Sequence, residues 1–419
     1  TLLANMFLSE VERGRGAAYL DPQGDVFREL AAHCRGREED VIIFDPADRE
    51  WPVGLNILEA EEHVDPDLVC AQIIGIFQLL FGKTWGPRME NILRNTVLVL
   101  LDNPGSTLVD IPRVLIDRPR RLEMLRNVRN PQLFFFWLKE ADSLSPAEWH
   151  KAIQPVLNKV GRFVSNPLVR NIVGQKRSGL NFREILDGRK ILLANLSKGQ
   201  IGAENTFLLG AILVAKLWLA ALSRYDLREA EREPYFLYVD EFQDFAFTGF
   251  LEMFSQARKY GLALTVANQF LAQLDEGVRQ AIFGNVGTIV SFTIGVSDAR
   301  ILAQEFAPYL EPLDFVNLPN HHIYLRLCVD GTTSRPFSAR SFPPLRPSLP
   351  PDEEEERVGH IRDRCRSRYA VPRREVEAAL YGDEALGDFQ RRFLSGEFGE
   401  TEDDGIGEDV IALEGGEGG

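Results

Sequence analysis

The stretch Tyr235-Phe236-Leu237-Tyr238-Val239-Asp240-Glu241 decides the fold class of this sequence. Apolar and aromatic residues followed at once by two acidic ones are typical of a buried parallel strand that ends in carboxylates. In open α/β folds, ligands bind at that end of the strands. Asp240 could hold magnesium there, directly or through water, and Glu241 could orient the water that attacks a γ-phosphate. Taken alone, the pattern fits equally well a strand that merely ends in a charged loop.

A second apolar stretch, Leu262 to Ala267, also ends in polar side chains, because Asn268-Gln269 come directly after it. An amide at this tip, beside the first strand, could contact the γ-phosphate or the attacking water. Further strands are expected at residues 17–20, 41–44, 190–196 and 288–293, with a hairpin of 323–329 and 333–337. Continuous apolar strands that alternate with helices predict an α/β fold with a mostly parallel sheet.

Strand patterns are missing from residues 60–187, where helical periodicity dominates and prolines separate short helices. We therefore predict an all-α domain at 60–187, inserted into an α/β domain formed by residues 1–59 and 188–342. A long helix is expected from about Ala203 to Ala230.

The net charge of −15 is concentrated near the C-terminus, since residues 351–419 hold 20 acidic and 9 basic side chains. The remainder is close to neutral, which argues against a protein that coats nucleic acid with its whole surface but leaves room for a basic channel. Residues 343–419 are expected to form a Pro-rich linker, one short helix near 372–380 and a disordered acidic tail.

Cysteines and histidines show no metal-ligand spacing, so reduced thiols and no metal at these residues are expected. The longest apolar stretch, residues 207–222, contains Lys216 and is shorter than a bilayer span. No membrane-crossing segment is therefore predicted within the sequence. Because the sequence starts at Thr1 within an apparent helix, we expect it to be a fragment of a longer protein.

One arginine lies between the two polar strand ends. Arg258 follows a predicted helix, in Ala257-Arg258-Lys259-Tyr260-Gly261. It could reach the nucleotide of a neighbouring subunit as an arginine finger. A cation stabilised at a helix C-terminus is the simpler explanation when the residue is taken alone.

In combination, these motifs resemble the conjugative coupling-protein ATPases of the TraD/TraG type, within the HerA–FtsK group of RecA-like P-loop motors. The resemblance spans roughly residues 1–380, and the all-α insertion fits it, because coupling proteins carry one. The motifs that carry it occur in the family's order: Leu20-Asp21-Pro22-Gln23-Gly24-Asp25, Tyr238 to Asp244, Ala257 to Leu262 and Ala267-Asn268-Gln269.

The resemblance implies a RecA-like P-loop NTPase fold and assigns roles to matching residues. Asp240 would be the magnesium partner and Glu241 the catalytic carboxylate. Gln269 would sense the γ-phosphate, and Arg258 would act in trans within a homo-hexamer. Two further residues, Asp21 and Asp25, match a family turn beside the nucleotide. The implied cofactors are ATP and magnesium.

One departure from the family is serious, because the sequence contains no G-x-x-x-x-G-K-[ST] loop to hold the β- and γ-phosphates. The segment Gly82-Lys83-Thr84 fits only the end of that motif, with Phe77 at the position of its first glycine. Family members carry T-L-L directly after the loop, so Thr1 is expected to follow it. Without the loop, the sequence is expected neither to bind ATP tightly nor to hydrolyse it.

A basic stretch in the insertion contains Arg118, Arg120 and Arg121 and could contact DNA phosphates, although a solvated helix face explains it more simply.

The resulting hypothesis is an ATP-driven, hexameric DNA-translocating motor, with secretion-channel or DNA-processing partners. It would work in the cytoplasm, at the inner face of the membrane if the upstream region anchors it. Two alternatives stay open: a HerA-like end-processing or packaging motor, and a loop-less scaffold that recruits secretion substrates without hydrolysis.

Overall fold

The computed structural model describes residues 1–59, 64–247, 249–274, 276–345 and 350–382. The chain divides into two units, Thr1–Arg373 and Arg374–Gly419. The first unit holds the strands and the candidate site. Helix α18 (Arg373–Tyr381) accounts for the described part of the second unit, near the position expected for a short helix. The predicted acidic tail beyond residue 382 lies outside the described residues.

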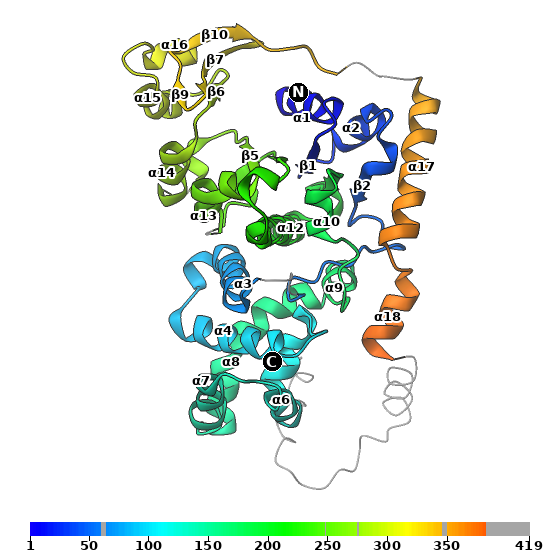
Figure 1. The fold of residues 1–419 in the computed structure, drawn as a ribbon. Helices are drawn as coiled ribbons and strands as arrows, with labels where there is room; N and C mark the ends of the chain where they lie inside the picture. Colours follow the sequence, from blue (N-terminus) through cyan, green and yellow to red (C-terminus); the bar gives the residue numbers. More distant parts are fainter. Residues whose placement is uncertain (60–63, 248, 275, 346–349, 383–419) are drawn as a thin grey trace, which may run out of the picture. The chain divides into compact units, whose positions relative to one another are not determined.

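A five-stranded, all-parallel sheet forms the centre of the first unit (Figure 1). Its strands run in the order β2-β3-β1-β4-β5. They are β1 (Gly16–Asp21), β2 (Val41–Phe44), β3 (Ile191–Asn195), β4 (Tyr235–Val239) and β5 (Leu262–Val266). Each of the five lies where an apolar run predicted it, which confirms the α/β fold with a parallel sheet.

The side chains of the strands alternate between two apolar cores, as a pleated sheet requires. Ala17 and Tyr19 of β1 pack into one core with α1 (Leu2–Glu12), α2 (Phe27–His33) and α17 (Pro351–Tyr369). Ala18 and Leu20 point into the other core, which α12 (Ala203–Ser223) fills. Burial on both faces explains why these strands are continuously apolar.

Helix α12 is shorter than expected, because the chain turns at Arg224 rather than at Ala230. The buried Arg224 guanidinium donates to Asp187 and to the carbonyl of Glu233, at 2.8 and 2.9 Å, which fixes the turn. The helical stretch Ala203–Asp226 is long and apolar enough to cross a membrane by length and composition, yet 89% of its most apolar window is buried inside the protein. It is therefore a core helix in this structure.

Between β2 and β3 the described residues form helices and turns, apart from one β-bridge of Val53 with Ala370. Several of the prolines seen in the sequence stand in the first turn of a helix, where the absent N–H costs nothing. The helices are α3 (Pro66–Phe81), α4 (Pro87–Leu101), α5 (Ile111–Ile116), α6 (Arg118–Leu125), α7 (Pro131–Phe135), α8 (Pro146–Val164), α9 (Pro167–Val173) and α10 (Phe182–Asp187).

These helices share the apolar core of α12 and the sheet, so the two regions are continuous within Thr1–Arg373. The division into a motor domain and a separate insertion domain stays a prediction.

Two helices flank β5 in the chain, and a small second sheet follows them. Helices α13 (Gly249–Gln256) and α14 (Glu276–Asn285) pack together. Strands β10 (Phe337–Arg340), β7 (His322–Arg326) and β6 (Ile289–Ser291) make an antiparallel sheet covered by α15 (Val296–Glu305) and α16 (Pro312–Val316). The hairpin expected from residues 323–329 and 333–337 forms in part: β8 (Cys328–Val329) turns at Asp330-Gly331 into β9 (Thr332–Thr333). Its longer second strand is β10, at 337–340 rather than 333–337, paired with β7.

Helix α17 corrects the expectation for residues 343–419, because a 19-residue helix forms where only a linker was expected before residue 372. It covers the edge strand β2 with its buried face of Val358, Ile361 and Cys365. The Cys365 sulfur lies 3.4 Å from both the N–H of Ile43 and the carbonyl of Val41. These contacts protect an edge that would otherwise be open to pairing with another chain.

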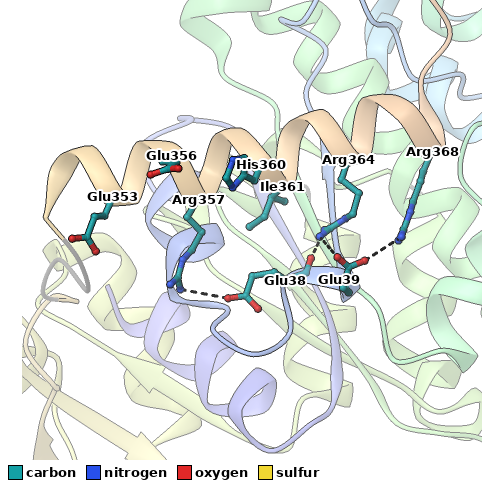
Figure 2. Close-up of a pocket in the computed structure, with 9 residues that line it drawn as sticks. All are labelled: Glu38, Glu39, Glu353, Glu356, Arg357, His360, Ile361, Arg364 and Arg368. Carbon is teal, nitrogen blue, oxygen red and sulfur yellow. Dashed lines mark hydrogen bonds and ion pairs between the residues drawn. The ribbon is translucent and has the colours of Figure 1, made fainter.

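Ion pairs join α17 to the 3-10 turn (Glu38–Asp40) before β2 (Figure 2). Arg357 contacts Glu38 at 3.5 Å, while Arg364 and Arg368 both contact Glu39, at 3.3 and 3.1 Å. A cavity of about 840 Å³ lies beside these pairs. Because Glu38 and Glu39 precede β2, this cavity lies at the amino end of that strand, away from the strand ends that carry the candidate site.

Candidate functional site

Polar side chains occupy the carboxyl end of every strand in the parallel sheet. Asp21 ends β1, Asn195 ends β3, Asp240 follows β4 and Asn268 lies just beyond β5. Asp45, which follows β2, accepts a hydrogen bond from the Asn195 amide at 3.0 Å. The in-register pairing of the strands brings this row to one edge of the sheet.

Asp240 and Glu241 stand where β4 turns sharply into a 3-10 turn (Phe242–Asp244). Glu241 has a left-handed backbone, with φ of 46°, which is strained for a residue with a side chain and recurs at functional sites. The N–H of Phe242 donates to the carbonyl of Ala267 at 2.7 Å, so the ends of β4 and β5 are tied together. As a result Gln269 reaches across and donates from its amide to the Glu241 carboxylate.

Two residues that the sequence did not single out also contact this pair. Gln243 donates from Nε2 to Glu241 Oε2 at 2.6 Å, and the buried Tyr19 hydroxyl lies 3.4 Å from Asp240 Oδ2. The sequence did not identify Tyr19 as a site residue, because a tyrosine within an apolar strand is usually part of the hydrophobic core. Its register opposite Tyr238, two residues before Asp240, places it there.

Burial raises the pKa of the Asp240 carboxyl above its ordinary value. The hydrogen bond from the Glu241 N–H, at 3.0 Å, opposes this rise in pKa, while the nearby carboxylates of Glu241 and Asp21 add to it. A carboxylate held under such conditions is poised to accept a cation, which would relieve the repulsion.

We expect Asp240→Asn to stabilise the ligand-free protein at neutral pH by about 0.5–2 kcal/mol, the usual size of a stabilising substitution. A raised folded-state pKa means that the folded protein loses stability as the pH rises through the titration of this carboxyl. The neutral amide avoids that loss, so the gain should vanish in acid, where the carboxyl is protonated in folded and unfolded chains alike. Chemical denaturation as a function of pH measures this. A variant less stable than wild type at neutral pH would contradict the prediction.

Asp21 lies in the row, but both of its carboxylate oxygens are engaged by the backbone. They accept from the N–H groups of Gln23, Gly24, Val26 and Phe27 at 2.8–3.1 Å. The side chain therefore shapes the loop after β1 rather than reaching a ligand. Asp25, in contrast, is exposed on that loop and available to one.

Arg258 is exposed and lies away from this row, in a 3-10 turn (Ala257–Tyr260) directly before β5. Because β4 and β5 are parallel and in register, Arg258 stands at the end of the sheet where strands begin. A five-residue strand, about 16 Å long at 3.3 Å per residue, separates it from Glu241 of the same chain. Its proposed action is possible only toward another subunit.

The basic stretch of α6 is occupied by contacts within the protein. Arg121 is only 3% exposed, donates to the carbonyl of Val114 at 2.9 Å and lies against the ring of Trp137. Because it is buried, the Arg121 guanidinium has no exposed surface that could contact a phosphate. Arg118 pairs with Asp142 at 2.8 Å and Arg120 with Glu123 at 2.7 Å, but both are exposed and stay candidates for DNA contact.

A cavity of about 330 Å³ opens beside Asp240. The first residues of α1 and the exposed rings of Phe292 and Phe342 line it, together with His321 and Pro344. Its size and its mixture of aromatic walls with one carboxylate are typical of a small-molecule site.

The residues present fit magnesium only as part of a complex with a phosphate ligand. Within the described part of the chain no three His, Cys, Asp or Glu side chains lie close enough to hold a metal ion. Magnesium normally takes one or two carboxylates and completes its shell with water and substrate phosphates. Asp240 could supply the single protein carboxylate of such a shell.

Gly82-Lys83-Thr84 forms a 3-10 turn at the end of α3 and does not follow a strand, so it is not a phosphate-binding loop.

Comparison with solved structures finds two proteins of similar fold. The bacterial conjugative coupling protein TrwBdeltaN70, in an unbound form, matches with a TM-score of 0.55 at 18% identity, over 83% of each chain. VirB4 of Thermoanaerobacter pseudethanolicus matches with a TM-score of 0.52 at 16% identity, over 81% of this chain and 85% of VirB4. No protein-family profile and no curated protein sequence matches the chain.

Proposed function

We propose that the chain is the motor part of a type IV secretion ATPase of the conjugative coupling type, which hydrolyses ATP to move DNA. One observation carries the proposal: Asp240, Glu241 and Gln269 meet at the carboxyl edge of a parallel sheet whose fold matches TrwB and VirB4. Because the sequence identity is low, these structures support only the fold, and the site residues support the chemistry.

In this proposal each residue of the edge has a distinct task. Asp240 would hold the magnesium ion, which neutralises charge on the transferred phosphate when it is bound. Glu241 would orient and deprotonate the attacking water, and the Gln269 amide would connect the carboxylate to the γ-phosphate. The loop shaped by Asp21 would place Asp25 beside the nucleotide.

Arg258 would complete the site of a neighbouring subunit in a homo-hexamer, because it lies too far from Glu241 of its own chain. This arrangement would make hydrolysis depend on assembly. Arg118 and Arg120 remain candidates for contact with DNA, and a secretion-channel component or DNA-processing protein would be the partner.

The test is ATP-dependent displacement of a strand or protein block from single- and double-stranded DNA by the full-length protein. The full-length protein is required because residues 1–419 contain no glycine-rich phosphate loop. Displacement with ATP but not with a non-hydrolysable analogue supports a motor. ATP hydrolysis without displacement would refute translocation, and no ATP binding at all would favour the scaffold.

We further propose that the aromatic side of the cavity, formed by Phe292 and Phe342 and opposite the phosphate end at Asp240, seats the base of the nucleotide. Phe342 is 75% exposed and Phe292 is 41% exposed, which suits rings that stack on a ligand. A stacked base contributes about 1–3 kcal/mol, so Phe342→Ala should weaken ATP binding by about tenfold.

Tripolyphosphate, which has no base, should bind the Phe342→Ala variant as it binds wild type. The matched control is Phe135→Ala, another exposed ring on α7, which should change neither affinity. Calorimetric titration of both ligands measures this. An equal loss for ATP and tripolyphosphate would show that Phe342 does not contact the base.

A further inference from the structure

The Glu241 carboxylate is held at both of its oxygens by glutamine amides. Gln243 donates to Oε2 at 2.6 Å, and Gln269 donates to Oε1. An ionised carboxylate only accepts hydrogen bonds, so each glutamine must present its NH₂ group to it. Glu241 is 9% exposed, and these two amides therefore determine how its carboxylate is oriented.

The two amides differ in how firmly the fold anchors them. Gln243 lies on the turn that directly follows Glu241, and hydrogen bonds from Asp244 N–H to Glu241 and from Phe245 N–H to Phe242, both at 2.9 Å, close that turn. Phe242 and Phe245 are fully buried on either side of Gln243. The backbone that carries Gln243 is thus fixed by the core.

Gln269 comes from a different and more exposed place. It follows β5 by three residues, and it and the next residue, Phe270, are both exposed. Its contact with Glu241 depends on the side chain reaching across from the neighbouring strand end. A side chain in this position can exchange partners without disturbing the core.

We propose that Gln243 is a positioning residue that holds Glu241 by Oε2 throughout the cycle, while Gln269 is the exchangeable partner at Oε1. The proposal rests on the proposed ATPase function of this site. When a γ-phosphate is present, the Gln269 amide donates a hydrogen bond to the phosphate in place of Glu241 Oε1. Oε1 is then free to accept a hydrogen bond from water. Gln243 keeps the carboxylate from rotating as this happens.

The reaction that this arrangement serves is hydrolysis of ATP. The oxygen of water forms a bond to the γ-phosphorus, and the bond from that phosphorus to the bridging oxygen breaks. A proton of the water passes to Glu241 Oε1 and then to solvent, which leaves ADP and inorganic phosphate. Gln243 touches none of the reacting atoms, so its effect must act through the orientation of Glu241.

The test is the steady-state kinetics of Gln243→Ala and Gln243→Met in the full-length protein. Methionine has a similar length and no donor, so it preserves packing if alanine impairs folding. Both variants should lower kcat by about 10–100-fold and leave KM and ATP affinity within about twofold of wild type. Gln256→Ala, on the exposed face of α13, is the matched control and should behave as wild type.

The split between kcat and KM supplies a readout that a purely structural role would not move. A change that only loosened the fold would weaken ATP binding as well, whereas a misoriented Glu241 carboxylate lowers kcat alone. Wild-type kcat in the methionine variant would overturn the role of Gln243 while leaving the ATPase proposal intact. A wild-type protein that does not hydrolyse ATP would overturn both.

Discussion

Replacing Glu241 with glutamine is expected to lower kcat for ATP hydrolysis by about 10²–10⁴-fold, the range associated with loss of a general base. The amide cannot accept the proton of the attacking water. It also places an NH₂ group against the donating amides of Gln243 or Gln269, which lie on either side of the native carboxylate. Both effects act on the chemical step.

Nucleotide affinity should survive in the Glu241→Gln variant, because Asp240 and the cavity beside it are unchanged. Initial rates of phosphate release and ATP titrations on the full-length protein separate the two quantities. Glu252→Gln, an exposed change of the same chemistry on α13, serves as the control. Hydrolysis within a few-fold of wild type in Glu241→Gln would remove this carboxylate from the mechanism.

Replacing Arg121 with alanine is expected to destabilise the protein by about 2–5 kcal/mol, the range for truncating a large buried side chain. The guanidinium lies 5.1 and 5.7 Å from the ring centres of Trp137 and Trp149 and contacts Asp142 at 3.3 Å. It also satisfies the carbonyl of Val114. Its removal leaves a cavity beside the two indoles and takes one of two cations from Asp142, which keeps Arg118.

Urea denaturation followed by tryptophan fluorescence measures this loss, since Trp137 and Trp149 adjoin the substituted residue. Arg120→Ala is the matched control, because Arg120 pairs on the surface with Glu123 and such pairs contribute at most about 1 kcal/mol. A stability loss for Arg121→Ala no larger than that of the control would contradict the structural role.

In DNA-binding assays, the double variant Arg118→Ala, Arg120→Ala should bind DNA more weakly than wild type.

The sequence predicted the sheet well because its strands are buried on both faces. Ala17 to Leu20 and Val41 to Phe44 are continuously apolar, and such runs bounded by Asp-Pro have few alternative interpretations. The meeting of Glu241 with Gln269 followed from topology, since both come directly after neighbouring parallel strands.

Helix α17 could not be predicted in the same way, because its sequence is dominated by charge. Its buried residues Val358, Ile361 and Cys365 recur at helical spacing, but they are few within a 19-residue helix. They become an apolar face only against β2, a strand that lies more than 300 residues earlier in the chain.

The roles of individual polar residues could not be predicted from the sequence, because tertiary contacts determine them. In the sequence Arg121 cannot be told from its exposed neighbours Arg118 and Arg120, but in the structure it is buried against two tryptophans. In the sequence Asp21 resembles a ligand-binding carboxylate, but in the structure it accepts hydrogen bonds from four backbone N–H groups. Gln243 acquires a partner only because the backbone reverses at Glu241.

The central claim is that the edge formed by Asp240, Glu241 and Gln269 is the hydrolytic centre of a DNA motor. The most direct measurement is the rate of phosphate release from magnesium-ATP by the full-length wild-type protein, with and without DNA. The account predicts hydrolysis that requires magnesium and rises when DNA is added. No hydrolysis under either condition, or a rate indifferent to magnesium and DNA, would contradict it.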